Sequence, residues 1–325
     1  MKRREFIAGL GGVATWPVVA GAQQSPIPLV GFLSSRSPED SAPHLEGFLR
    51  GLKAFGYVDG QTVSIAYRWA MGHYDRLPDL AHELASLHPA VIAAPGGTPS
   101  ARAAKQATAS IPVLFVTTDA VRDGLVASLN RPGGNLTGVD FMSGGLAGKR
   151  LELVAQLVSA ADPVALLINP NAAGADSYKQ DFELAAHTMG RRSITVSAGS
   201  DDDLETSFST LVNSKIAALV VENDPFFDSR RDHLIALCEQ HSIPAIYHIR
   251  EFPAAGGLMS YGSSLVNAYY QMGVAAGRIL KGARVEDLPV VRPTQFELVI
   301  NVKTAKTLGL TVPPALIATA DEVIE

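Results

Sequence analysis

Short runs of aliphatic and β-branched residues alternate with longer helical patterns from Pro28 onward, and this alternation constrains the fold more than any other feature. Alternating β and α segments are typical of a parallel sheet that helices cover on both faces. The first series of expected strands comprises 29–33, 63–67, 91–94, 113–116 and 136–139. The second comprises 164–168, 193–197, 217–221 and 245–247, with another strand at 298–300. The fold class is therefore α/β.

The two series of strands repeat one another. Ser110-Ile111-Pro112 precedes a strand of the first series as Ser242-Ile243-Pro244 precedes one of the second. Pro28 and Pro163 open the first strand of each series, and the spacing to the following strand is similar in both. We therefore predict two doubly wound parallel-sheet lobes of similar topology.

Each predicted lobe is discontinuous in sequence. The helical pattern after Ser263 has the character of the first lobe, and 296–310 supplies one more strand and helix. We assign 23–140 plus 251–292 to lobe 1 and 141–250 plus 293–325 to lobe 2. The chain then crosses between the lobes three times and forms a multi-stranded hinge. A ligand cleft is expected between the lobes, because the carboxyl ends of parallel strands meet at one edge of each sheet.

Length and charge agree with a two-lobed protein that binds no nucleic acid. The chain has 325 residues and 47% hydrophobic content, whereas a single core stops growing near roughly 250 to 300 residues. The formal net charge is −5, and no stretch is rich in lysine and arginine. A phosphate backbone would therefore find little to bind.

An export signal is predicted at 1–22. Three basic residues at 2–4 precede an apolar run at 6–20 that glycines and a proline interrupt, which favours a cleaved signal over a membrane-spanning helix. The paired arginines favour the twin-arginine route, with an ordinary Sec signal as the alternative. We therefore expect a periplasmic protein.

The chain contains one cysteine, Cys238, so no disulfide can form within it. This thiol lies in a helical pattern and is expected to be buried. Because no cysteine follows the predicted cleavage site, we expect no lipid anchor. We also expect a monomer.

Small polar residues, glycines and aromatic rings follow the expected strands in both lobes. Serine, threonine and asparagine at such positions also serve as helix caps, so only their collective position indicates a ligand site. The backbone N–H groups at the helix start after Gly97 are suited to a ligand carboxylate. Phe226 and Tyr247 fit a core position equally well. The candidate ligand-binding residues are Ser34, Ser35, Gly97, Thr98, Thr117, Thr118, Asn169, Asn171, Asn223, Phe226, Tyr247 and Tyr261.

Motifs for catalysis and for cofactors are missing from the sequence. It has no G-x-G-x-x-G after the first strand, no G-x-S-x-G, and no zinc-ligand spacing among its 8 histidines. We predict a small-molecule ligand, no catalytic residue, no cofactor and no metal. Two alternatives remain open: an exported α/β enzyme working through Asp119 and His248, and a receptor that signals to a membrane sensor.

Longer motifs are spread over nearly all of the chain beyond the predicted signal. They include Tyr67-Arg68-Trp69-Ala70, Arg131-Pro132-Gly133-Gly134-Asn135, Asp224-Pro225-Phe226-Phe227-Asp228 and Gly256-Gly257-Leu258-Met259-Ser260. These motifs resemble the ABC-transporter substrate-binding family typified by tryptophan and phenylalanine binders.

The resemblance implies a type I periplasmic-binding fold, a ligand enclosed by hinge closure, and delivery to ABC permease subunits in the inner membrane. It also implies an aromatic or amino-acid-like ligand. One departure leaves the ligand open, because Thr118-Asp119-Ala120 stands where relatives commonly have Gly-Asp-Pro.

Overall fold

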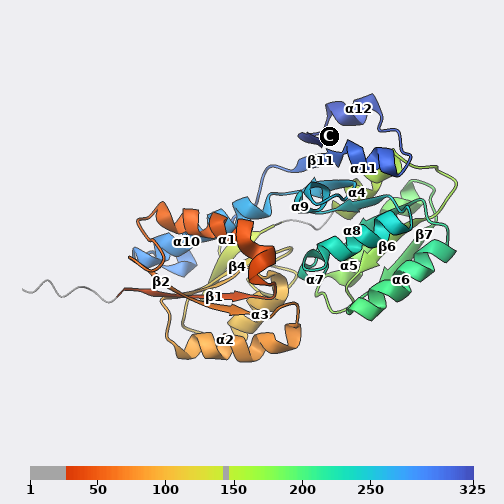
Figure 1. Cartoon of the computed structure of the whole chain (residues 1–325). Helices are drawn as coiled ribbons and strands as arrows, with labels where there is room; N and C mark the ends of the chain where they lie inside the picture. Colours follow the sequence, from red (N-terminus) through yellow and green to blue (C-terminus); the bar gives the residue numbers. More distant parts are fainter. Residues whose placement is uncertain (1–26, 142–145) are drawn as a thin grey trace, which may run out of the picture.

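The computed structural model describes residues 27–141 and 146–325, so the predicted export signal at 1–22 lies outside the described residues. Figure 1 shows two α/β lobes side by side, one formed mainly by the first half of the chain and one by the second. Each lobe contains one sheet, of 5 strands in the first and 7 in the second. The predicted fold class is confirmed.

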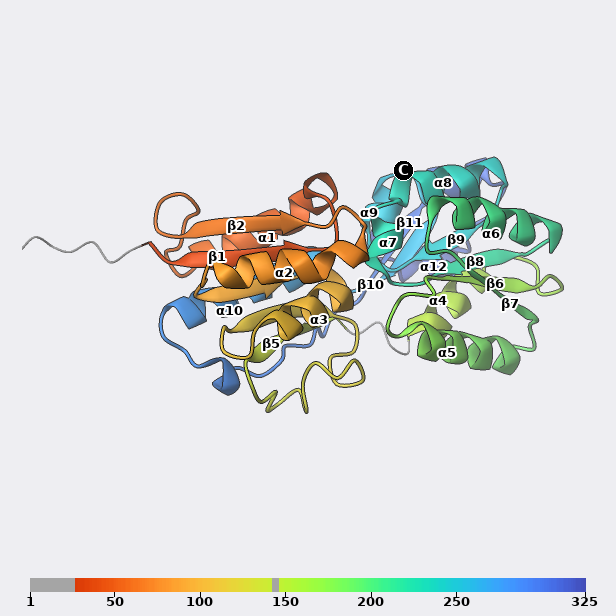
Figure 2. The ribbon, with the colours of Figure 1, turned by 90° about the horizontal axis from the view of Figure 1, so that it is seen from below.

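The sheet of the first lobe is wholly parallel and has the order β2-β1-β3-β4-β5. Figure 2 shows α2 and α3 in front of this sheet, and α1 and α10 pack on its other face. The inner strands are almost continuous apolar runs, because helices cover both faces. The elements of this lobe are β1 (Leu29–Ser34), α1 (Pro38–Lys53), β2 (Ser64–Trp69), η1 (Tyr74–Arg76), α2 (Leu77–Ser86), β3 (Val91–Ala94), α3 (Gly97–Ala107), β4 (Val113–Thr117), β5 (Leu136–Asp140), α10 (Leu265–Leu280) and η2 (Val285–Asp287).

The sheet of the second lobe has the order β12-β11-β10-β9-β8-β6-β7, and within it β11 runs antiparallel to β10. The elements of this lobe are α4 (Leu146–Ala155), β6 (Val164–Ile168), α5 (Ala175–Thr188), β7 (Ser193–Ser197), α6 (Asp201–Asn213), β8 (Ala218–Val221), α7 (Pro225–Asp228), α8 (Arg231–Gln240), β9 (Ala245–Tyr247), α9 (Glu251–Ala254), β10 (Met259–Gly262), β11 (Glu297–Asn301), α11 (Val302–Thr307), α12 (Pro314–Ala318) and β12 (Glu322–Ile324).

The internal repeat predicted from the strand pattern is present in the topology. Strands β1 to β5 have the order 2-1-3-4-5, and strands β6 to β10 have the same order in the second sheet. The helix after each fifth strand crosses to the other lobe, since α4 packs on β8 to β10 and α10 packs on β3 to β5. With the return from η2 to β11, the chain crosses three times, so three segments form the hinge.

The strand Met259–Gly262 corrects the predicted division of the chain at residue 251. It pairs with β9 and β11 in the second sheet, and α9 packs beside it, although both segments were assigned to lobe 1. The physical reason is the repeat itself, because β10 is the fifth strand of the second lobe as β5 is of the first. Return to the first lobe begins at α10, close to the predicted change of character after Ser263.

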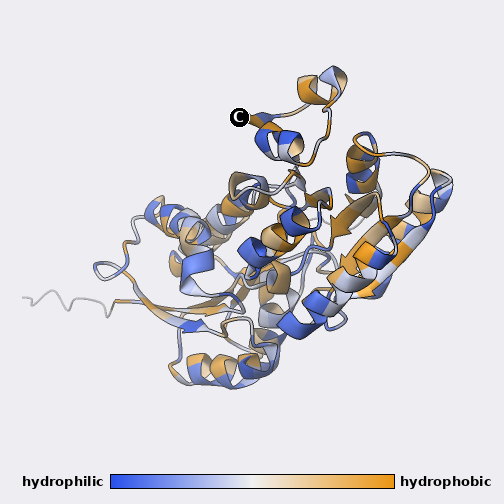
Figure 3. Cartoon of the chain, turned by 45° about the vertical axis from the view of Figure 1, so that its right-hand side comes forward, coloured by the Kyte–Doolittle hydropathy of each residue, from blue (hydrophilic) through white to orange (hydrophobic). Residues whose placement is uncertain are grey.

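Glycines allow the backbones of helices α1 and α10 to approach each other closely. A Cβ on Gly51 would lie 2.3 Å from the carbonyl oxygen of Tyr270, and one on Gly273 would lie 2.2 Å from that of Phe48. Both helices begin with a serine N-cap, Ser37 in α1 and Ser264 in α10. Figure 3 shows hydrophobic and hydrophilic residues alternating along helices of both lobes, as expected for helices with one buried face.

Candidate functional site

A cavity lies where the carboxyl ends of the two sheets meet. Its first wall comes from loops after β1, β3 and β4, and its second from loops after β6 and β8 and from α5. Strands of parallel sheets end at one edge, and helix N-termini are brought to the same place. The cavity therefore occupies the predicted cleft between the lobes.

The loop between β3 and α3 brings the first wall close to the second lobe. Gly97 has a φ of +77°, a left-handed conformation that favours glycine, and a Cβ there would lie 2.8 Å from Cγ of Pro225. A Cβ on Gly96 would lie 2.3 Å from the backbone nitrogen of Ser35. These two glycines thus allow α3 to begin at the cavity, where the N–H groups of its first turn have no partner within the helix.

Two threonine hydroxyls of the first wall are committed to one carboxylate. The hydroxyls of Thr98 and Thr117 lie 2.7 Å and 3.0 Å from Oδ2 of Asp123, and they lie 2.5 Å from one another. Because each hydroxyl has a single proton and both protons lie within this group of three oxygens, each hydroxyl can only accept a further hydrogen bond. This part of the wall is suited to a ligand donor.

The second wall is rich in carboxylates that follow β8. Oδ1 of Asp224 accepts hydrogen bonds from Asn169 Nδ2 and Tyr74 Oη, each at 2.8 Å, and from the backbone N–H of Phe226 at 3.0 Å. Burial nevertheless raises the pKa of Asp224. Glu222 is 3% exposed, and burial, with a smaller contribution from Asp224, raises its pKa to about 8.

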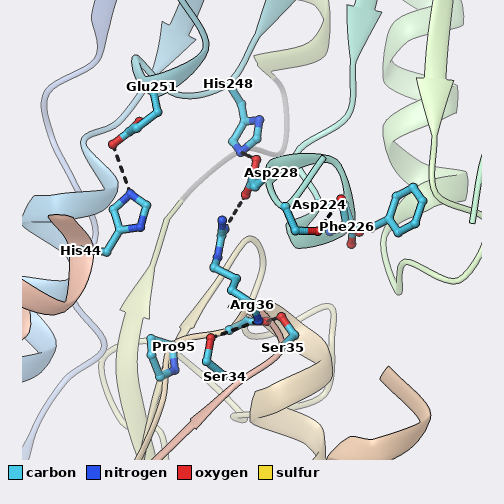
Figure 4. A network of polar contacts seen from close by, with 12 residues as sticks. Ser34, Ser35, Arg36, His44, Pro95, Asp224, Phe226, Asp228, His248 and Glu251 are labelled. Atoms are coloured by element: carbon cyan, nitrogen blue, oxygen red, sulfur yellow. Dashed lines mark hydrogen bonds and ion pairs between the residues drawn. The ribbon is translucent and has the colours of Figure 1, made fainter. Parts of the chain in front are cut away.

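A buried ion pair joins the lobes beside the cavity. Arg36, which follows β1, pairs through Nη2 with Oδ2 of Asp228 on α7. Nε2 of His248 lies 3.1 Å from the other oxygen of Asp228. Figure 4 shows Arg36 pointing across from the first lobe toward Asp228, with His248 beyond it. Burial alone would raise the pKa of Asp228, but Arg36 and His248 outweigh burial and hold it well below its ordinary value.

A second polar contact joins the lobes near this pair. Nε2 of His44 on α1 lies 3.1 Å from Oε1 of Glu251, which begins α9, and Figure 4 shows both contacts in one region. Burial favours a higher pKa for Glu251, but the hydrogen bond and charge of His44 lower it overall. Two ionised carboxylates and one guanidinium thus lie within the interface between the lobes.

The structure brings five of the predicted ligand-binding residues together in the cavity. They are Gly97, Thr98, Thr117, Thr118 and Asn223. Nδ2 of Asn223 is buried without a hydrogen-bond partner, so it is a free donor at the second wall. A neighbouring hollow, which shares Thr98 with the cavity, is lined by three more of the predicted residues: Asn169, Asn171 and Phe226.

Four predicted residues lie elsewhere. Ser34 and Ser35 are fully buried, and their hydroxyls bond to the backbone of Arg36 and of Gly96, so they support the loops behind the cavity. The position predicted for Tyr247 is wrong, because its ring stacks on Phe252 in the core of the second lobe at 4.1 Å between centroids.

Tyr261 also lies away from the cavity. Its ring stacks on Phe296 at 6.0 Å between centroids, and its carbonyl accepts a hydrogen bond from Nε of Arg150. The predicted position at the cleft fails because Tyr261 belongs to β10, a strand inside the second sheet, where side chains point to the sheet faces.

Sequence reasoning missed the charged residues of the site. Arg36 immediately follows Ser34 and Ser35, and Glu222 immediately precedes Asn223, so the rule that strand ends carry the site was sufficient to find both. Asp228 carries no such signal, because it contacts Arg36 only after the lobes come together.

The alternative of an enzyme working through Asp119 and His248 finds no support in the geometry. Asp119 pairs with Arg122 at the cavity, whereas His248 is 1% exposed and faces Asp228. Within 27–141 and 146–325, no group of three or more His, Cys, Asp or Glu side chains is arranged to hold a metal ion. No helix in these two ranges has the length and apolarity needed to span a membrane.

Two lobes of matching topology, three crossing segments and a cavity between the lobes define a two-lobed solute-binding protein. The sequence model of the family described as "ABC transporter substrate binding protein" matches residues 38–324. The chain belongs to this family, which confirms the resemblance inferred from the motifs. Since the family consists of binding proteins, the prediction that the chain is not an enzyme is also confirmed.

One curated relative is a "Tyrosine-binding protein" of Clostridioides difficile (strain R20291), 29% identical over 267 residues, which are 82% of this chain and 76% of that protein. A solved conserved domain protein from Vibrio cholerae has 26% identity and a TM-score of 0.84, and the match covers 91% of this chain and 99% of that chain. A domain from Streptococcus pneumonia in complex with L-Trp has 24% identity and a TM-score of 0.83 over the same shares of both chains.

Proposed function

We propose that this protein is the exported, periplasmic receptor of an ABC importer, and that it binds a small carboxylate-bearing ligand, aromatic or amino-acid-like, between its lobes. One observation carries the proposal: a cavity between the lobes is lined by the first turn of α3, by buried Arg36 and by the free amide of Asn223. All three supply hydrogen-bond donors for a carboxylate.

The relatives support the class of ligand. One is named a tyrosine-binding protein, and a structural neighbour was solved with L-Trp. The neighbouring hollow is lined by the aromatic ring of Phe226, and the guanidinium of Arg230 stacks on this ring with its Cζ 4.0 Å from the centroid. An aromatic side chain of the ligand would extend toward this ring, whereas its carboxylate would face the donors.

Export and delivery complete the proposal. The basic residues and apolar run at 1–22 support secretion through the twin-arginine or Sec route. Ligand binding would favour closure of the lobes about the three crossing segments, and the closed form would be the one that the permease recognises. No cofactor enters this function.

Calorimetry with L-tyrosine, L-tryptophan and L-phenylalanine tests the ligand class. We expect at least one of them to bind with micromolar affinity or better. Replacing Gly97 by aspartate should abolish binding, because a carboxylate would then occupy the start of α3. Gly133→Asp is the matched control, since Gly133 also has a positive φ of +69° but has nothing within 4 Å of its Cβ position. No heat with any of the three amino acids, while another solute binds tightly, would overturn the ligand class.

A further inference from the structure

Glu222 is a buried carboxyl without a cation. It follows β8, is 3% exposed and lines the cavity. Its Oε2 accepts one hydrogen bond, from the backbone N–H of Asn169 at 2.8 Å. In the described ranges, no Lys, Arg or His forms an ion pair with it.

The nearby acid Asp224 also forms no ion pair in the described ranges, but it accepts more hydrogen bonds than Glu222 does. One oxygen of Asp224 receives three hydrogen bonds, so its place in the loop is fixed by donors of the protein itself. Arg150, a fully buried cation of the second lobe, donates through Nη1 to Tyr178 Oη at 2.6 Å and through Nε to the carbonyl of Tyr261, and its Nη2 has no hydrogen-bond partner. Arg150 forms no ion pair with Glu222.

The first wall of the cavity also lacks free hydrogen-bond donors at Thr98 and Thr117. The hydroxyls of Thr98 and Thr117 bond to Asp123 and to one another, so their two protons stay within this group and a ligand meets lone pairs. The same cavity contains unpartnered donors, because Nε of Arg36 and Nδ2 of Asn223 are buried without hydrogen bonds. A ligand that satisfies the whole cavity must therefore carry a strong donor and a strong acceptor.

We infer that Glu222 binds the ammonium group of a zwitterionic α-amino acid, and that it selects amino acids over simple carboxylic acids. This inference rests on the proposed function, since it assigns one end of the ligand in the same cavity. The cation that is missing beside Glu222 then arrives with the ligand. A buried carboxylate costs free energy unless it is paired, so the ionised form of Glu222 becomes favourable when the ammonium lies beside it.

The state of Glu222 gives the inference a second consequence. Burial raises the pKa of Glu222 to about 8, so most of the molecules hold it protonated at pH 7. An ammonium at hydrogen-bond distance lowers this pKa, and the proton leaves on binding. The charged and titratable groups that share the cavity are Asp224, Tyr178, Asp181, Asp119, Arg122, Asp123 and Arg36.

The first test compares amino acids with their des-amino analogues. The wild type should bind L-tyrosine and L-tryptophan at least tenfold more tightly than 3-(4-hydroxyphenyl)propionate and indole-3-propionate, as expected for a charge-assisted hydrogen bond. In Glu222→Gln this preference should shrink at least tenfold, mainly through weaker binding of the amino acids. The glutamine keeps an oxygen for the N–H of Asn169, so the variant should fold.

The second test measures how many protons the protein releases when the ligand binds. Calorimetry in buffers of different ionisation enthalpy should show that L-tyrosine binding releases most of one proton at pH 7 and clearly less at pH 9. Glu222→Gln should release almost none. Glu183→Gln, an exposed position on α5, is the matched control and should behave as the wild type does.

The outcomes separate the inference from the proposed function. If the wild type binds amino acids but Glu222→Gln keeps both the preference and the proton release, Glu222 is only a structural carboxyl and the inference is wrong. If the wild type binds no α-amino acid at all, the inference fails together with the ligand class. The inference is supported if Glu222→Gln loses both the preference for amino acids and the proton release, while Glu183→Gln keeps both.

Discussion

Replacing Asp228 by asparagine should open the lobes of the ligand-free protein. Asp228 and Arg36 are each 4% exposed and come from different lobes, so the variant leaves a guanidinium buried without its carboxylate. Breaking a buried pair in this way costs about 3–5 kcal/mol. The protein can avoid most of that cost by separating the lobes, because water then reaches Arg36.

The size of the effect on ligand binding follows from this opening of the lobes. A penalty of about 3 kcal/mol on the closed form shifts the equilibrium between closed and open forms by roughly 150-fold. If the ligand is held only by the closed form, the apparent Kd for L-tyrosine should rise, by at most about the same factor, which is reached when the wild type is already mostly open. The free energy of unfolding should fall by less than 3 kcal/mol, since opening relieves the buried charge before the lobes unfold.

Small-angle scattering and calorimetry check this prediction. The radius of gyration of ligand-free Asp228→Asn should exceed that of the wild type. Arg250→Gln is the control, since it breaks the Arg250–Glu322 pair, whose side chains are both 42% exposed, and should cost less than about 1 kcal/mol without opening the lobes. An unchanged scattering curve and a Kd within threefold of the wild type would show that the Arg36–Asp228 pair does not hold the lobes together.

Three further changes have defined outcomes. Gly97→Ala and Gly133→Ala both force alanine into a left-handed conformation, which costs roughly 1–2 kcal/mol of stability in each variant. Only Gly97 faces Pro225 across the cleft, so only Gly97→Ala should weaken ligand binding, by tenfold or more in calorimetry. Gly51→Ala should lower the free energy of unfolding in urea by about 1–3 kcal/mol, because the new Cβ meets a backbone carbonyl of α10 that cannot move aside. Between the ordinary glutamate pKa of about 4.3 and the raised pKa of about 8, Glu222 is protonated in the folded wild type and ionised in the unfolded chain. The free energy of unfolding therefore falls as pH rises across this window, by up to about 1.4 kcal/mol per pH unit. Urea titrations from pH 5 to 9 should show a smaller decline in Glu222→Gln.

The pH dependence of the ion pair between the lobes has the opposite sign. The pKa of Asp228 is depressed in the folded protein, so the pair is complete above the ordinary carboxyl range near about 3.9 and is lost only as pH falls well below it. Scattering from the wild type should therefore stay unchanged between pH 5 and 8.

Most strands were predictable because their signal is local. Val164–Ile168 and Val91–Ala94 are fully buried apolar runs bounded by proline or glycine, and such runs need no knowledge of their partners. Met259–Gly262 was missed because its four residues include a serine and a glycine, which give no apolar run. Its membership of the second sheet depends on β9 and β11, one of which lies beyond an entire helix of the other lobe.

The site was predictable only in part, for a related reason. The rule that ligands meet strand ends identified Gly97, Thr98, Thr117, Thr118 and Asn223, because each follows its strand within a few residues. Which side chains turn into the cavity depends on partners far away in sequence. Arg36 and Asp228 are separated by 192 residues and meet across two lobes, so no periodicity or spacing in the chain reports their contact.

The internal repeat explains why the two walls differ in chemistry. Strands β3 and β8 hold the same place in their sheets, so the loops that follow them are counterparts, and a Cβ on Gly97 would touch Pro225 where these loops meet. After β3 the loop carries glycines that leave N–H groups free at the start of α3, whereas after β8 it carries Glu222 and Asp224. Equivalent positions thus offer donors on one lobe and carboxylates on the other. A ligand with both charges can contact both lobes at once, and only such a ligand gives closure an energetic advantage from each wall.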